Sequence, residues 1–151
     1  MSLAHHRLRA ALPDGPFRQT LPQLAHGQAL FILGLRVAIR SQLPPTAVPV
    51  PLAHVFEQDA ATVNIALRRF ALILGIGARR KFTVGPPCAI GITADEHSIV
   101  GLLNAINTGD RSRTKAHLEW LATPAHHAAI IDAGAEVTDL FACRGVTFDA
   151  R

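Results

Sequence analysis

The chain has 151 residues, of which 49% are hydrophobic and 17% are charged, a composition too apolar for a disordered protein. A chain of this length can bury a core of its own, so folding requires neither a metal nor a disulfide framework. The charge is uneven: residues 1–82 hold ten Lys or Arg against three acids, and residues 83–151 hold five against eight. This asymmetry suits a nucleic-acid surface, but it equally suits two segments that pack on each other or on a second copy.

The first residues, 1–20, contain Pro13, Gly15 and Pro16 without a sustained apolar period, which predicts an N-terminal arm rather than a signal peptide. The longest apolar run of the first half, residues 29–35, ends at Arg36, whereas a membrane span needs about 20 apolar residues. We therefore expect a cytoplasmic protein without a membrane partner. The two cysteines, Cys88 and Cys143, lie far apart in the sequence, as is typical of a reducing compartment.

From Leu21 onward, apolar residues recur at helical spacing until Pro44 and Pro45, which predicts a first helix that is apolar over most of its circumference. After a proline-rich extended segment, a second helix is predicted from about Leu52 to Leu74, where apolar residues alternate at spacings of four and three. Helices of this kind are buried on several sides. We expect a central core or a homodimer seam formed by Leu30, Phe31, Leu35, Phe56, Val63, Leu67 and Phe70.

The connector of residues 83–97 gathers a thiol, two carboxylates and an imidazole, and so could hold a reactive or metal-binding site. Its end, Thr93-Ala-Asp-Glu96, has the pattern of a capping box that begins a helix, and Asp95 adds negative charge at the positive end of that helix. Cys88 has no neighbouring cysteine and no assigned histidine partner, so we expect it to have a packing role rather than a reactive one.

Three more helices are predicted beyond the connector: one from Thr93 to the turn at Gly109, one over about 111–122, and one from Thr123-Pro124 to about Cys143. We expect Cys143 to lie in the core and the tail, residues 144–151, to pack loosely. The predicted fold is all-α, a bundle of about five helices with two long apolar helices and a C-terminal cluster of shorter ones. Residues 21–143 form its single domain.

A nucleic-acid surface is one alternative. Residues 99–120 have the layout of a helix-turn-helix whose second helix is basic, although Lys115 stands where that motif usually buries an aliphatic residue. The phosphate-binding candidates are Arg111, Arg113 and Lys115, with Arg79, Arg80 and Lys81 at the end of the second predicted helix. The basic run also has a local role, because positive charge is favourable at a helix C-terminus.

A metal site is a second alternative. His54 and Glu57 are three residues apart on one predicted helix, a spacing that helical di-iron bundles use in the opposite order and supply twice. The sequence contains no second copy of this pair. Solvent-exposed helix positions therefore account for the two residues better than metal ligation, and we predict no cofactor.

Gly85-Pro-Pro-Cys88, Thr93-Ala-Asp-Glu96, Gly109-Asp110 and the helix end Leu118-Glu-Trp-Leu121 together resemble a group of uncharacterised small helical proteins of alphaproteobacteria. The resemblance covers roughly residues 83–122 and implies no known activity. In that group the connector often carries two cysteines that flank a proline, whereas Ala89 and Ile90 follow Cys88 here.

These patterns favour a bacterial interaction or regulatory protein, non-enzymatic rather than enzymatic, that forms a homodimer and can bind a protein partner. A nucleic-acid-binding regulator and a metal-dependent helical-bundle enzyme are the alternatives.

Overall fold

The computed structural model describes residues 20–40 and 47–148. In that part of the chain the elements are η1 (Leu21–Gln23), α2 (His26–Arg40), α3 (Val50–Phe56), η2 (Glu57–Asp59), α4 (Ala60–Gly77), α5 (Ala94–Thr108), α6 (Arg111–Leu121), η3 (Pro124–His126) and α7 (His127–Cys143). These residues form no strand, only isolated bridges between Thr20 and Gly91 and between Ala78 and Ala122. The predicted all-α bundle is confirmed. Most of the predicted N-terminal arm, and part of the proline-rich segment, lie outside the described residues.

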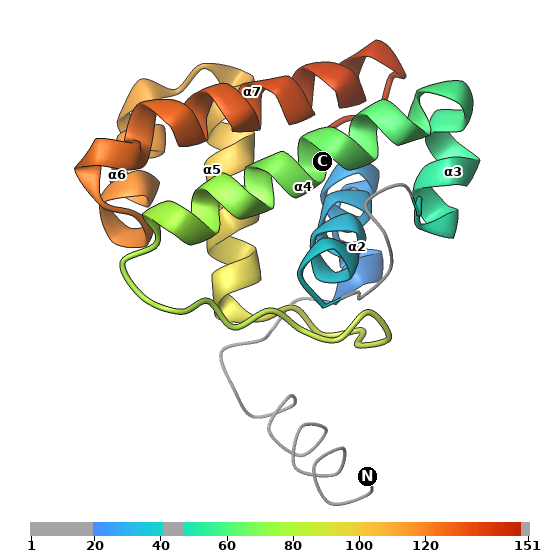
Figure 1. The fold of residues 1–151 in the computed structure, drawn as a ribbon, viewed down its shortest axis with the longest axis horizontal. Helices are drawn as coiled ribbons and strands as arrows, with labels where there is room; N and C mark the ends of the chain where they lie inside the picture. The colour runs from blue at the N-terminus through green and yellow to red at the C-terminus, as the bar shows by residue number, and fades with distance from the viewer. Residues whose placement is uncertain (1–19, 41–46, 149–151) are drawn as a thin grey trace, which may run out of the picture.

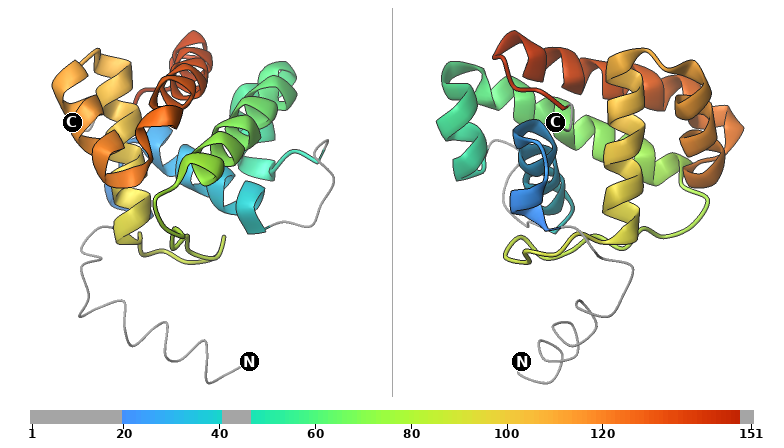
Figure 2. Two further views of the ribbon diagram at one scale, coloured as in Figure 1. Left: turned by 60° about the vertical axis from the view of Figure 1, so that its left-hand side comes forward. Right: turned by 180° about the vertical axis from the view of Figure 1, so that it is seen from behind.

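The helices form two layers. In one layer α4 and α7 lie side by side and run in opposite directions (Figure 1). In the other layer α2 and α5 cross beneath them, as the view from behind shows (Figure 2). α6 packs on α5, and α3 packs on the start of α4. The connector between α4 and α5 runs along the edge of the molecule, below the end of α2 (Figure 1).

Aromatic rings fill the space between the layers. Phe31 of α2 meets Phe70 of α4 edge to face with ring centroids 5.8 Å apart, and Phe56 meets Phe141 at 4.8 Å. The residues predicted for the core or the dimer seam are all at most 5% exposed within the single chain: Leu30, Phe31, Leu35, Phe56, Val63, Leu67 and Phe70. Their apolar surface is therefore already covered by the chain itself, and a dimer would have to use other residues.

The predicted second helix is interrupted, and the expectation of one continuous helix is wrong. α3 ends at Phe56, Glu57 adopts a positive φ of 50°, and α4 begins at Ala60 after the turn of η2. The apolar spacing continues through this break, because Phe56 and Ala60 are both buried on either side of it. The spacing of apolar residues therefore gave no sign of the break in the helix.

The C-terminal residues are also packed more tightly than expected. Val146 and Phe148 are buried, and the Phe148 ring lies 5.0 Å from Phe141 and 6.1 Å from Phe31, measured between centroids. The Gly27 amide at the start of α2 donates to the Thr147 carbonyl at 3.0 Å. The tail up to residue 148 is thus part of the core.

The α5–α6 hairpin follows the sequence closely. Thr93 and Glu96 form the predicted capping box at the start of α5, with reciprocal hydrogen bonds of 3.0 and 2.9 Å. α5 ends at Gly109, whose φ of 74° is left-handed and strains any residue with a side chain. Asp110 then caps α6 by accepting from the Arg113 amide at 3.1 Å.

One stretch, Val50–Gly77, is long and apolar enough to pass for a membrane span. Of its most apolar 18-residue segment, 44% is buried inside the fold. A core helix of a soluble protein passes the same test, so this is weak evidence for a membrane span. The stretch also contains the break at Glu57.

Candidate functional site

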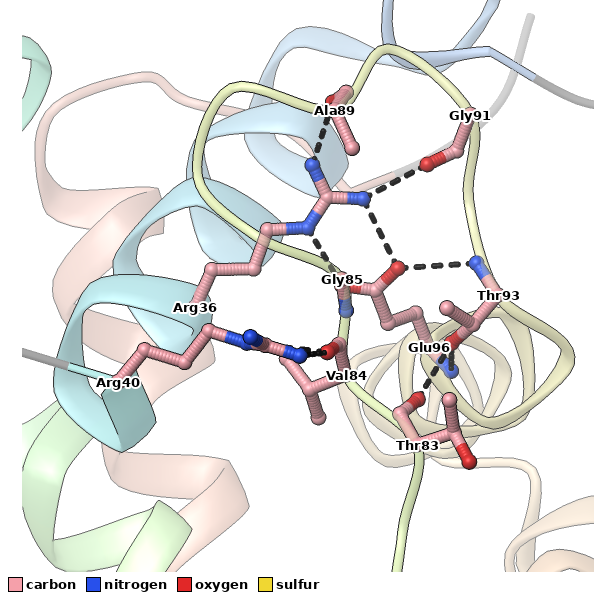
Figure 3. Close-up of polar contacts among 9 residues, drawn as sticks. All are labelled: Arg36, Arg40, Thr83, Val84, Gly85, Ala89, Gly91, Thr93 and Glu96. Atoms are coloured by element: carbon pink, nitrogen blue, oxygen red, sulfur yellow. Dashed lines mark hydrogen bonds and ion pairs between the residues drawn. The ribbon is translucent and has the colours of Figure 1, made fainter. Parts of the chain in front are cut away.

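The connector of residues 83–97 is held by a buried ion pair that the sequence did not reveal. Arg36 of α2 and Glu96 of α5 form a two-pronged contact, from Arg36 Nε to Glu96 Oε2 at 2.6 Å and from Nη2 to Oε1 at 2.9 Å (Figure 3). Both side chains are 0% exposed. The guanidinium also donates to the connector backbone, at the carbonyls of Ala89 (2.6 Å) and Gly91 (2.8 Å). The pair therefore joins two helices and the loop between α4 and α5.

The hydrogen-bonding capacity of Glu96 is also filled. Its carboxylate also accepts from the amides of Thr93 at 2.9 Å and Gly85 at 3.3 Å. At Gly85 the backbone lies so close to Arg36 that an added Cβ would stand 3.1 Å from Nη2, so a glycine fits this contact best. A buried charge pair is stable only when its remaining hydrogen-bonding capacity is satisfied, and this pair meets that condition.

Asp95, the second connector carboxylate, is also engaged. It is 6% exposed and accepts from Arg80 and from the Thr83 amide, the latter at 2.6 Å. Burial raises the pKa of Asp95, but the hydrogen bonds from Arg80 and Thr83 outweigh burial and bring the pKa below its ordinary value. Both carboxylates that suggested chemistry in the sequence thus hold the connector in place.

The cysteines lie elsewhere than expected. Cys88 and Cys143 are both free and exposed, so neither has the packing role that the sequence predicted for it. Cys88 stands at the outer turn of the connector, whose inward groups are the Ala89 and Gly91 carbonyls that accept from Arg36. Neither thiol has a disulfide partner among the described residues.

The proposed metal pair is not assembled. His54 lies in α3, whereas Glu57 comes after the end of that helix with a positive φ, so the two do not share a helix face. Both are exposed. In residues 20–40 and 47–148, no group of three or more His, Cys, Asp or Glu side chains is placed to hold a metal ion.

Two other histidines, His97 of α5 and His117 of α6, influence each other electrostatically. The ring of His117 lies against the α5 backbone at Gly101, where an added Cβ would come within 2.8 Å of it. The pKa of His117 is lowered, first by burial and then by the positive charges of Arg113 and His97.

The basic candidates fall into two groups. Arg111, Arg113 and Lys115 are exposed on α6, and Lys115 makes a distant contact of 3.9 Å with Glu119. Arg79 and Arg80 are exposed but engaged: Arg79 donates to the Glu119 carbonyl at 2.8 Å, and Arg80 binds Asp95.

Arg80 also stands beside two aromatic rings, with its Cζ 6.0 Å from the Phe82 centroid and 5.9 Å from that of Trp120. Lys81 has no hydrogen bond or ion pair to any described residue. Of the basic run after α4, Lys81 is therefore the cation that remains free within the described chain.

An open cleft of about 570 Å³ lies between α2 and α4. Its lining comes from Leu35 and Ile39 of α2, from α4 between Ala71 and Ala78, from the segment that follows α4, and from Ile99 of α5. Arg80 and Lys81 are the charged residues of the lining, and no acid of the described chain lines it. The cleft is thus apolar with a cationic rim.

The outward face of α4, next to the cleft, carries an apolar stripe that the sequence analysis missed. Ile65, Leu72 and Ile76 are 62%, 64% and 64% exposed. With Arg69 they follow one another at spacings of four, three and four, which puts them on one side of the helix. We call Ile65, Arg69, Leu72 and Ile76 the α4 stripe.

Comparisons with known proteins found no match, whether with family models, with curated sequences or with solved structures. The function of the protein must therefore be inferred from the arrangement of its side chains.

Proposed function

We propose that this protein is a non-enzymatic helical interaction module that pairs with a second copy of itself through the α4 stripe. The observation that supports this proposal is the exposure of three large aliphatic side chains on one face of a helix whose opposite face is buried. Contiguous apolar patches on a protein surface commonly mark interaction sites. The connector carboxylates, which could have served catalysis, are occupied by Arg36 and Arg80, and this favours binding over chemistry.

The stripe is self-complementary under a two-fold axis. If two α4 helices cross in opposite directions between positions 69 and 72, Ile65 of one copy lies opposite Ile76 of the other, and Arg69 opposite Leu72. In this arrangement an isoleucine of one copy meets an isoleucine of the other at both ends of the contact. A two-fold interface requires such a match, because the same patch serves both partners.

Arg69 fits this arrangement. It already contacts Glu136 of α7 at 3.4 Å, with both side chains largely in water. Its aliphatic stem can cover Leu72 of the second copy while the guanidinium stays at the rim, as long cationic side chains commonly do. The arginine therefore does not interrupt the apolar contact.

Sedimentation equilibrium in the micromolar range tests the proposal. We expect the wild type to be dimeric and Leu72→Asp to be monomeric, since a carboxylate placed in the middle of the stripe would be buried opposite an apolar partner. Ile90→Asp is the matched control, because Ile90 is 63% exposed but lies in the connector. A wild type that is monomeric throughout the range would refute self-association.

The exposed cations of α6 support a second candidate, a nucleic-acid-binding regulator. Arg111 and Arg113 project from α6 without an ion pair to any described residue. We expect such binding to weaken steeply as salt rises, and the double variant Arg111→Ala/Arg113→Ala to reduce the salt dependence. A duplex-binding titration that shows no binding at low salt would reject this candidate.

A further inference from the structure

We infer that the cleft between α2 and α4 binds an amphipathic carboxylate, an unbranched acyl chain with one anionic end held at Lys81. This binding site is separate from the α4 stripe and does not depend on self-association. Its volume of about 570 Å³ falls within the range of roughly 300–1,000 Å³ typical of small-molecule sites.

The floor of the cleft suits an aliphatic chain. Ile39 is 50% exposed although Leu35, one turn earlier on α2, is fully buried, so Ile39 offers apolar surface to the cleft. Ala71 and Phe82 extend this surface, and Gly75 leaves open space, since nothing stands within 4 Å of a Cβ added there. An apolar chain placed here would remove this surface from water.

The rim favours an anion. Arg80 is neutralised by Asp95, but the ammonium of Lys81 lacks a partner in the described chain, and no acid there lines the cleft. A carboxylate at this end would gain a charge-assisted hydrogen bond without displacing an existing one.

The polar groups beside the cleft also argue against a peptide as the occupant. The Thr83 amide is used by Asp95, the Val84 carbonyl by Arg40, and the Gly85 amide by Glu96. A bound peptide backbone would find few free partners there, and unpaired backbone groups are costly to bury. A ligand with an apolar body and a single anionic end avoids that cost.

Titration with dodecanoate, dodecanol and dodecyltrimethylammonium tests the inference directly. Trp120, the single tryptophan of the chain, stands beside Arg80 at the cleft rim, so its fluorescence reports on binding, and calorimetry gives the affinity. We expect dodecanoate to bind about fivefold more tightly than dodecanol, the effect of about 1 kcal/mol from one exposed charge pair. The cationic amphiphile should bind least.

Three variants assign the contacts. Lys81→Ala should remove the preference for dodecanoate while leaving dodecanol binding in place. Gly75→Leu should weaken both by filling the cleft, and Gly75→Ala, which adds only one carbon, should weaken them less. Circular dichroism verifies that each variant is folded.

Three results would overturn the inference: no dodecanoate binding by the folded wild type, equal affinity for all three amphiphiles, or binding only of an acidic helical peptide. If the wild type binds no dodecanoate and Gly75→Leu is monomeric, the cleft is assigned to the second copy. A monomeric wild type that still binds dodecanoate would refute the proposed dimer and leave this site intact.

Discussion

The connector and the outward side of α4 use their side chains in opposite ways. In the connector, a buried arginine and two buried carboxylates are joined to each other and to backbone groups. On α4, Ile65, Leu72 and Ile76 are exposed to water, and Lys81 just beyond the helix has no partner in the described chain. The polar cluster most suggestive of chemistry is therefore structural, whereas the face without polar motifs keeps three large apolar side chains exposed to water.

The largest effect should come from breaking the buried pair. Arg36→Met leaves the Glu96 carboxylate buried without its cation, and we expect a loss of about 3–5 kcal/mol in the free energy of unfolding, measured by urea denaturation. Adding Glu96→Gln should restore part of this loss, because glutamine can still accept from the Thr93 amide. The exposed pair provides the control: Lys115→Met should cost less than about 0.5 kcal/mol. Similar losses in the free energy of unfolding for Arg36→Met and Lys115→Met would contradict a structural role of the buried Arg36–Glu96 pair.

The second prediction concerns Asp95 and pH. Because its pKa is lowered in the folded protein, Asp95 contributes stability above the pKa of the unfolded chain, and this contribution is lost as pH falls through the folded value. We therefore expect Asp95→Asn to be less stable than the wild type at neutral pH and to depend less on pH below about pH 5. Unfolding curves from neutral to acidic pH measure this difference. Parallel pH profiles for the two proteins would show that Asp95 is not held by Arg80.

Arg68 differs from Arg36, because part of its guanidinium is buried without hydrogen-bond partners among the described residues. The Nε and Nη2 atoms of Arg68 are buried without a hydrogen bond to any described residue. Replacement by leucine removes these unpaired donors, so we expect Arg68→Leu to raise the free energy of unfolding by about 1 kcal/mol. Arg111→Leu, at an exposed position, is the control and should change little. A loss of stability in Arg68→Leu comparable to that of Arg36→Met would show that Arg68 is paired in solution.

The smallest effect should come from the connector thiol. Cys88 is exposed and contributes no contact to the ion pairs around it, so Cys88→Ser should change the free energy of unfolding by less than about 0.5 kcal/mol. Ligand binding and sedimentation should also be unchanged. A change in either one would give the thiol a role that the arrangement of the connector does not require.

The parts of the fold that depend on neighbouring residues were predictable from the sequence. The Thr93–Glu96 capping box and the end of α5 at Gly109 each use residues within one helical turn, and both are confirmed. The break after Phe56 was missed because the apolar spacing continues through it.

The candidate sites depend on contacts between distant residues, which the sequence pattern does not give. Arg36 and Glu96 are separated by 60 positions. The sequence therefore predicted the capping role of Glu96 at the start of α5 but not its ion pair with Arg36. A signal was nevertheless present: one arginine, Arg36, inside the otherwise apolar run of the first helix required a buried partner. Ile65, Leu72 and Ile76 were hidden by the apolar character of α4 as a whole, and only the packing of α2 and α7 shows which face remains open.

Oxidative cross-linking of single-cysteine variants tests whether two copies pair through the α4 stripe. In a background with Cys88→Ser and Cys143→Ser, Ile65→Cys is mixed with Ile76→Cys, and each is also oxidised alone. Along one helix the two positions lie about 16 Å apart, so an antiparallel pairing brings the thiol at position 65 of one copy to the thiol at position 76 of the other but keeps identical positions apart. We predict a disulfide-linked dimer in the mixture and little in either variant alone. Cross-linking of each variant with itself, or none in the mixture, would contradict the pairing of two copies through the α4 stripe.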